Sequence, residues 1–207
     1  MKISYAITVC NEFVEIQKLI PFLLKHKRHE DEIVVLYDIS NGHEGIEQFL
    51  RAKSINGEFA WMPGEFKGHF ADWKNKLNSF CTGDYIFQID ADELPPKYLV
   101  ENLWTILEMN KTVDVYRVPR INTVKGLTQE HIQKWGWRVD NKERVNFPDY
   151  QWRIYRNDPK IKWVNKVHEV LTGFEAMSEL PPEEEYCLIH EKTIKRQEKQ
   201  NNFYNTL

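Results

Sequence analysis

Apolar and polar residues recur in two regular patterns along the first 110 residues of the chain. Short, nearly continuous apolar runs predict buried strands, and segments with apolar residues three or four positions apart predict helices. The predicted strands are residues 3–10, 31–38, 57–62 and 85–90, and the predicted helices are residues 12–27, 42–53, 69–80 and 97–110. This alternation indicates right-handed crossovers and a mostly parallel sheet flanked by helices, which is an α/β fold.

The pattern is less regular in the second half of the chain. Alternating residues predict strands at 113–120, 150–157, 161–170 and 185–191, and the polar residues 192–207 predict a surface helix. Residues 120–149 have no clean period, so we expect a long functional loop there. Trp73, Trp104 and Trp163 lie at regular spacing within predicted elements and are expected in the core. We expect one domain over residues 1–207, with a mixed C-terminal part.

The composition restricts the class of protein. With 42% hydrophobic and 29% charged residues the chain is typical of a folded globular protein, and its longest apolar runs are too short to span a membrane. A net charge of −3 argues against a general nucleic-acid binder. Three cysteines without CxxC spacing indicate a reducing, cytoplasmic setting, and the N-terminus has no signal-peptide pattern.

Three carboxylates, Asp90, Asp92 and Glu93, follow the apolar residues of "YIFQIDADEL". Clustered carboxylates cost free energy unless a cation or a proton offsets their charge, so the cluster is either a solvated turn or a cation site. Oxygen ligands at this spacing suit Mg²⁺ or Mn²⁺, which share their coordination with waters and substrate phosphates. The position after the fourth predicted strand favours the cation site.

Other predicted strands also end in polar residues. Asn11 and Glu12 follow the first strand, and Asp38 and Ser40 end the second. Ligands of open α/β sheets bind at the carboxyl ends of the strands. We therefore expect these side chains to converge on one cleft.

The sequence resembles the family-2 glycosyltransferases with the GT-A fold, in particular the short bacterial and viral members. The matching segments are "AITVCNE", "EIVVLYDISN", "ADWKNKLNSFCTGDYIFQIDADE" and "WRIYRNDPKIKWVNKVHE". The resemblance implies a Rossmann-like sheet, with residues 1–100 binding a nucleotide sugar and residues 101–207 facing the acceptor. One departure is "DWKN", which stands where many members have "ARN".

The resemblance also implies roles for residues of the nucleotide side. Asp38 stands where the family reads the base, usually uracil, Asp90 where it contacts the ribose or a metal-bound water, and Asp92 where it binds Mn²⁺ or Mg²⁺. Thr8, Asn11 and Glu12 lie in the nucleotide-side loop.

Candidates for the chemistry lie in the second half. Glu169 follows an alternating predicted strand, so we expect it to be the base that takes the proton of the acceptor hydroxyl, with Asp149 in reserve. His190 is the candidate third metal ligand and His168 a candidate substrate-side group, although each is also compatible with a hydrogen-bonded structural histidine. Glu93 is assigned a supporting or helix-start role.

Three further residues have two open interpretations each. Arg153 either faces the diphosphate or forms a structural ion pair. Trp135 and Trp137 either cover the face of an acceptor sugar or anchor their loop in the core.

These predictions favour a metal-dependent, inverting transferase that moves a sugar from a UDP-sugar to a saccharide or glycoconjugate acceptor. A nucleotidyltransferase would carry a glycine-rich loop after its first strand, which "TVCNEFVE" does not provide. An aspartyl phosphatase would place its D-x-D motif earlier in the chain. A sugar-nucleotide or glycan-binding module without catalysis stays open, and the chain is compatible with being part of a longer multidomain protein.

Overall fold

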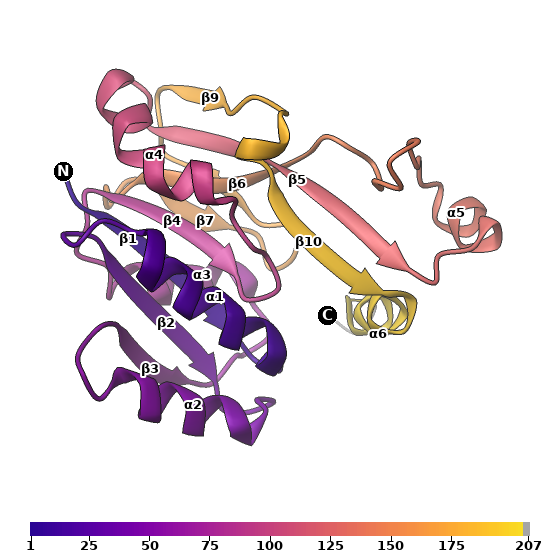
Figure 1. Cartoon of the computed structure of the whole chain (residues 1–207), viewed down its shortest axis with the longest axis horizontal. Coiled ribbons are helices and arrows are strands. Elements are labelled where there is room, and N and C mark those ends of the chain that lie inside the picture. The colour runs from indigo at the N-terminus through magenta and orange to yellow at the C-terminus, as the bar shows by residue number, and fades with distance from the viewer. Residues whose placement is uncertain (205–207) are drawn as a thin grey trace.

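One sheet of eight strands runs through the computed structural model, which describes residues 1–204 (Figure 1). Its strand order is β10-β5-β6-β4-β1-β2-β3, and β9 pairs with β5. The strands of this sheet are β1 (Ile3–Val9), β2 (Glu32–Asp38), β3 (Ala60–Gly64), β4 (Tyr85–Asp90), β5 (Val115–Lys125), β6 (Asp149–Arg156), β9 (Met177–Glu179) and β10 (Leu188–Thr193).

The strand directions confirm the predicted mostly parallel sheet. The neighbouring pairs β1–β2, β1–β4, β2–β3, β5–β9 and β5–β10 are parallel. Only β6 among the described strands of this sheet is antiparallel to its neighbours, β4 and β5. The carboxyl ends of β1, β2 and β4 therefore lie at the same edge of the sheet, where the sequence predicted a cleft.

Side chains of a strand alternate between the two faces of the sheet. In this sheet both faces carry apolar side chains, and helices cover both. Ile7 of β1 packs in one cluster with residues of α1 (Phe13–His26), α2 (Glu44–Ser54) and α4 (Lys97–Met109). Its neighbour Ala6 packs in the other cluster, with Trp73 and Leu77 of α3 (Phe70–Asn78). Figure 1 shows α1, α2 and α4 on one side of the sheet. Trp73 and Trp163 are buried, as predicted. Trp104 is 37% exposed and lies beside Arg28, so the prediction that Trp104 belongs to the core was wrong.

The segment predicted as a long loop, residues 120–149, contains regular structure. Strand β5 continues to Lys125, five residues beyond the predicted strand end, because β10 pairs with it along Arg120–Lys125. A short helix, α5 (Gln129–Trp135), follows with a capping box at Thr128 and ends at Gly136 in the left-handed conformation. In Figure 1 this helix projects far from the sheet.

The strand predicted at 161–170 is a hairpin instead. Strands β7 (Lys162–Val164) and β8 (Val170–Thr172) pair with each other, and the chain turns between them. Asn165 and His168 have positive φ angles of 77° and 54°, which a continuous strand cannot contain. Glu169 therefore lies in a turn and not at the end of a long strand.

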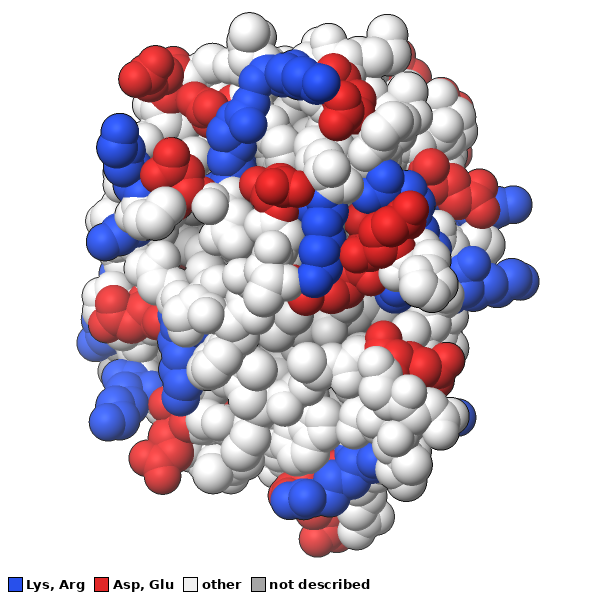
Figure 2. All heavy atoms as spheres, turned by 90° about the vertical axis from the view of Figure 1, so that its left-hand side faces the viewer, with Lys and Arg blue, Asp and Glu red and all other residues white. Residues whose placement is uncertain are grey.

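The C-terminal part ends in the predicted helix. A 3-10 helix (Glu184–Tyr186) precedes β10, and α6 (Ile194–Tyr204) follows it; residues 205–207 of the predicted helix lie outside the described residues. Within residues 1–204, no helix has the length and apolar content that crossing a bilayer requires. On the face shown in Figure 2, basic and acidic side chains are interspersed and neither sign forms a broad patch.

Candidate active site

The acidic motif begins where β4 leaves the sheet. Asp90 is the last residue of β4 and lies beside Thr8 in the parallel register with β1. The hydroxyl of Thr8 donates to Oδ1 of Asp90 at 3.3 Å, and the amide of Gln88 donates to the same oxygen at 3.1 Å. The sheet thus fixes the position of the first motif carboxylate.

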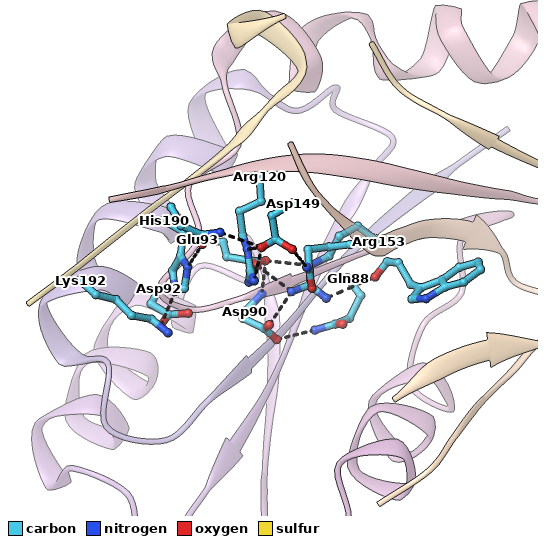
Figure 3. Close-up of polar contacts among 12 residues, drawn as sticks. Gln88, Asp90, Asp92, Glu93, Arg120, Asp149, Arg153, His190 and Lys192 are labelled. Atoms are coloured by element: carbon cyan, nitrogen blue, oxygen red, sulfur yellow. Dashed lines mark hydrogen bonds and ion pairs between the residues drawn. The ribbon is translucent and has the colours of Figure 1, made fainter. Parts of the chain in front are cut away.

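Two arginines balance the charge of the motif, Arg153, which is buried, and Arg120, which is partly buried (Figure 3). Glu93 is 1% exposed and accepts from Arg120 Nη1 at 2.8 Å and from Arg153 Nη2 at 2.7 Å. Arg153, 3% exposed, also donates to Oδ2 of Asp90 at 2.6 Å. Burial alone would raise the pKa of Asp90, but Arg153 and Lys74 outweigh it and hold this pKa well below its usual range. Arg153 therefore forms the structural ion pair that was one of its two interpretations.

Asp149 belongs to the same network. Its Oδ2 accepts from Arg120 Nε at 2.9 Å and Nη2 at 2.7 Å and from Asn122 Nδ2 at 2.7 Å, and its Oδ1 accepts from Gln151 Nε2 at 2.7 Å. Burial would raise the pKa of Asp149, but Arg120 and these hydrogen bonds lower it overall. Both oxygens of the reserve base are therefore already hydrogen-bonded.

Asp92 and His190 come together from opposite parts of the chain. His190 Nε2 lies 3.2 Å from Asp92 Oδ2, and its Nδ1 lies 2.6 Å from Asn122 Oδ1. Arg196 of α6 also approaches Asp92 Oδ2, at 3.3 Å. Burial would raise the pKa of Asp92, but His190 and Lys192 hold it well below its usual range. Asp92 is thus an ionised carboxylate among positive groups.

These two side chains fit the requirements of a divalent cation. Among the described residues no group of three or more His, Cys, Asp and Glu side chains converges as a closed metal cage. Mg²⁺ and Mn²⁺ sites that act on phosphates commonly use few protein ligands and complete their shell with waters and substrate oxygens. Asp92 and His190 are the residues that would hold such an ion.

The nucleotide-side residues line the adjoining strand ends. Asp38 is 3% exposed, and its carboxylate accepts from the backbone amides of Ser40 at 3.0 Å and Phe66 at 3.1 Å. Glu12 accepts from the backbone amides of Cys10 at 2.8 Å and Asn11 at 3.0 Å, which orders the turn after β1. Asn11 itself is exposed.

A cavity of about 390 Å³ opens beside the motif and brings the two halves of the chain together. Its lining includes Asp90, Asp92 and His190 together with Glu169, His168 and Trp137. The predicted site residues that do not belong to its described lining are Thr8, Asn11, Glu12, Asp38 and Trp135. Trp135 instead lies against Trp137, with 4.6 Å between ring centroids. The structure thus assembles most of the predicted site residues around one space.

Lys74, a buried lysine that the sequence did not predict as a site residue, contacts the candidate base Glu169. Lys74 of α3 is 4% exposed, and its Nζ lies 2.5 Å from Glu169 Oε1 and 4.4 Å above the ring of Trp163. This ion pair fixes the position of the Glu169 carboxylate. The departure "DWKN" contains Lys74, but the sequence assigned no role to that residue. Arg120 and Asn122 were also missed, because both lie in the segment predicted as a loop.

Comparison with solved structures identifies the fold as GT-A. Staphylococcus aureus TarS 1–349 superposes with a TM-score of 0.64 at 16% identity, over 92% of this chain and 60% of that chain. Its complex with UDP-GlcNAc gives 0.63 at 16% identity, over 93% and 59%. The mannosyltransferase PcManGT from Pyrobaculum calidifontis, in complex with GDP-Man and Mn²⁺, gives 0.49 at 20% identity, over 57% and 35%. The chain thus spans about 60% of the length of the TarS chain that it resembles.

The sequence comparison gives the family. Residues 4–167 match glycosyl transferase family 2, and no curated protein sequence matches the chain significantly. The chain belongs to glycosyl transferase family 2, as its motifs indicated.

Proposed function

We propose that this chain transfers a sugar from a UDP-sugar to a hydroxyl group of a saccharide or glycoconjugate, with inversion at the anomeric carbon and with Mn²⁺ or Mg²⁺. The observation that carries the proposal is the shared cavity, which the Asp92–His190 pair and the Lys74–Glu169 pair both line. The TarS structure with UDP-GlcNAc supports a uridine nucleotide as donor.

The donor occupies the edge formed by β1, β2 and β4 in this proposal. Asp38 orders the loop that receives the base, because it holds the amides of Ser40 and Phe66. Thr8, Asn11 and Glu12 border the nucleotide, and Asp90 meets the ribose. Arg153 acts on the donor through its ion pair with Asp90.

Asp92 and His190 hold the divalent cation that accompanies the diphosphate. When bound, the ion supplies Lewis-acid stabilisation of the negative charge that grows on the leaving diphosphate. Arg196 and Lys192, both near Asp92, add positive charge at the same place.

The acceptor binds on the side of the cavity formed by the second half. Glu169 takes the proton from the acceptor hydroxyl as that oxygen attacks the anomeric carbon, and the contact with Lys74 holds its carboxylate in place. The ring of Trp137 covers a sugar face, Trp135 supports that ring, and His168 lies on the substrate side. Asp149 is the alternative base, but its hydrogen bonds favour Glu169.

Calorimetry with UDP tests the donor and the cation together. We expect UDP to bind at least about tenfold more tightly with Mn²⁺ than with a chelator, and Asp92→Ala to abolish that difference. Glu58→Ala, which alters an exposed acidic residue far from the motif in sequence, is the control. Equal affinity with Mn²⁺ and with chelator in the unaltered protein would refute the role of Asp92.

A non-catalytic sugar-nucleotide-binding module is distinguished by turnover. A transferase should release UDP from UDP-GlcNAc or another UDP-sugar slowly without acceptor and faster with a saccharide acceptor. Tight UDP binding with no UDP release from any UDP-sugar would favour the binding module.

A further inference from the structure

Asn122 connects the predicted reserve base to the candidate metal ligand. It lies on β5, directly beside His190 of β10 in the parallel register. Its side chain contacts Asp149 through Nδ2 at 2.7 Å and His190 through Oδ1 at 2.6 Å. The side chain therefore bridges two groups that both line the cavity.

The surroundings of Asp149 fix the orientation of this amide. Asp149 accepts hydrogen bonds from Arg120 and from Gln151, and an ionised carboxylate has no proton to donate. The group of Asn122 that faces it must therefore be the NH₂ group. The reversed amide would set two acceptor oxygens, its own and Oδ2 of Asp149, against each other at 2.7 Å and would lose this hydrogen bond.

The amide orientation in turn determines the proton position on His190. Asn122 Oδ1 can only accept, so His190 Nδ1 must carry a hydrogen at this contact. In the neutral ring the other nitrogen, Nε2, then carries a lone pair, and this nitrogen lies 3.2 Å from Asp92 Oδ2. Two lone pairs at this separation repel each other unless positive charge lies nearby. Arg196 supplies part of that charge at 3.3 Å from Asp92 Oδ2, and a divalent cation would add to it.

We propose that Asn122, anchored by Asp149, is a positioning residue that holds His190 in the Nδ1–H tautomer and so presents Nε2, together with Asp92, to a divalent cation. This inference rests on the proposed function, in which the cation stabilises the charge on the leaving diphosphate. It gives Asp149 a role in anchoring and removes the need for it as a base. Ligands of neighbouring positions on an octahedral Mg²⁺ or Mn²⁺ are about 3 Å apart, given metal–ligand distances near 2.1 Å, which agrees with the Nε2 to Oδ2 separation.

Nuclear magnetic resonance on the unaltered, metal-free protein tests the tautomer directly. Two-bond ¹H–¹⁵N correlations of labelled histidine distinguish a nitrogen that bears a proton from one that bears a lone pair, and His190→Gln identifies the signals. Where the spectrum shows a single proton on the ring of His190, we expect that proton on Nδ1. A neutral ring with its proton on Nε2 would overturn the proposal without any variant.

A pair of matched variants separates positioning from general damage to the network. Asn122 and Gln151 both donate to Asp149 at 2.7 Å, but only Asn122 contacts His190. We expect Asn122→Leu to move the proton of His190 to Nε2, where Asp92 accepts it, and to weaken Mn²⁺ binding about 10–100-fold by calorimetry. Gln151→Leu should leave the tautomer and the Mn²⁺ affinity unchanged.

The outcomes also separate this inference from the proposed function. Equal Mn²⁺ affinity in folded Asn122→Leu and in the unaltered protein would overturn the positioning role even if UDP-sugar turnover were found. Conversely, a protein that failed to turn over UDP-sugars would refute the proposed function, while the tautomer and the Mn²⁺ affinities would still decide the role of Asn122.

Discussion

Glu93 carries a larger structural role than its position after the D-x-D motif suggests. It is almost fully buried and receives hydrogen bonds from Arg120 and Arg153, which in turn hold Asp149 and Asp90. Buried charges are tolerated only when they are paired, and removing one partner of such a pair costs about 3–5 kcal/mol. The third carboxylate of the motif therefore fixes the guanidinium groups that keep the first one in place.

At the residue scale we predict that Glu169→Gln lowers the turnover of a UDP-sugar by about 10²–10⁴-fold, because the amide cannot accept the proton of the acceptor hydroxyl. Binding of UDP with Mn²⁺ should be retained, since our proposal assigns Glu169 to the acceptor and not to the nucleotide. Steady-state kinetics with UDP-release detection and calorimetry measure the two effects separately. Turnover equal to that of the unaltered protein would exclude Glu169 as the base.

A variant of Lys74 tests the contact between Lys74 and Glu169 from the other side. Lys74→Met removes the ammonium group that contacts Glu169, whereas Lys76→Met removes a lysine of the same helix that lies over Trp73 instead. Turnover should fall more in the first variant than in the second. Equal losses would mean that Lys74 acts only through the stability of α3.

The residues of the site differ in how far the sequence predicted them. Asp90 and Asp92 stand at and just after the end of a recognisable strand, so local pattern was sufficient to select them as candidates. Lys74 lies on a helix face that otherwise contacts the core, where an apolar pattern leaves no sign of a charged partner 95 positions away. Asn122 depends on the β5–β10 register, which no local pattern contains.

At the scale of elements, the first-half strands and helices were predictable because both follow complete periods. The prediction failed where partners distant in sequence decide the structure. Strand β5 extends to Lys125 because β10 pairs with it, and the 161–170 segment turns because Asn165 and His168 adopt left-handed conformations. Neither residue type signals such a turn as strongly as glycine does.

The amino ends of β1 and β2 provide a pH-dependent test at this scale. Glu32 accepts from Lys2 at 2.7 Å, from Ser4 at 2.5 Å and from Thr82, and although burial opposes ionisation, these bonds lower its pKa from 4.5 to about 2. A depressed pKa contributes stability above the unfolded value, which is lost as the pH falls from about 4.5 through 2. We expect Glu32→Gln to lower the free energy of unfolding at pH 7 by about 1 kcal/mol, since the site is partly exposed.

Denaturant unfolding at several pH values measures this effect. The difference between Glu32→Gln and the unaltered protein should shrink as the pH falls below about 4.5, while Glu58→Gln, at an exposed position, should show little difference at any pH. If the difference in the free energy of unfolding stayed constant down to the lowest pH measured, the charge of Glu32 would not contribute to stability.

At the scale of the whole molecule, the sheet crosses the boundary between the predicted nucleotide half and acceptor half. Strand β4 pairs with β6 through Ile86–Tyr155 and Phe87–Ile154, so residues 1–112 alone would expose the edge of β4. We predict that this fragment shows no cooperative thermal unfolding, whereas residues 1–204 unfold cooperatively. Circular dichroism on heating measures both.

A cooperative transition in the fragment, together with UDP binding, would contradict that expectation. It would mean that the nucleotide half is a folding unit of its own and that the second half is an addition to it. The continuous sheet instead favours one domain over both halves.

The contact between Asp92 and His190 joins residues 98 positions apart in the chain. The ribosome synthesises the chain from its N-terminus, so β1 to β4 and the acidic motif are complete long before β10 exists. A cation held by both residues would also close a very long loop, with an entropic cost that rises only slowly with length. A chain whose synthesis ends after residue 93 and before residue 190 therefore carries the motif but lacks the partner that completes it.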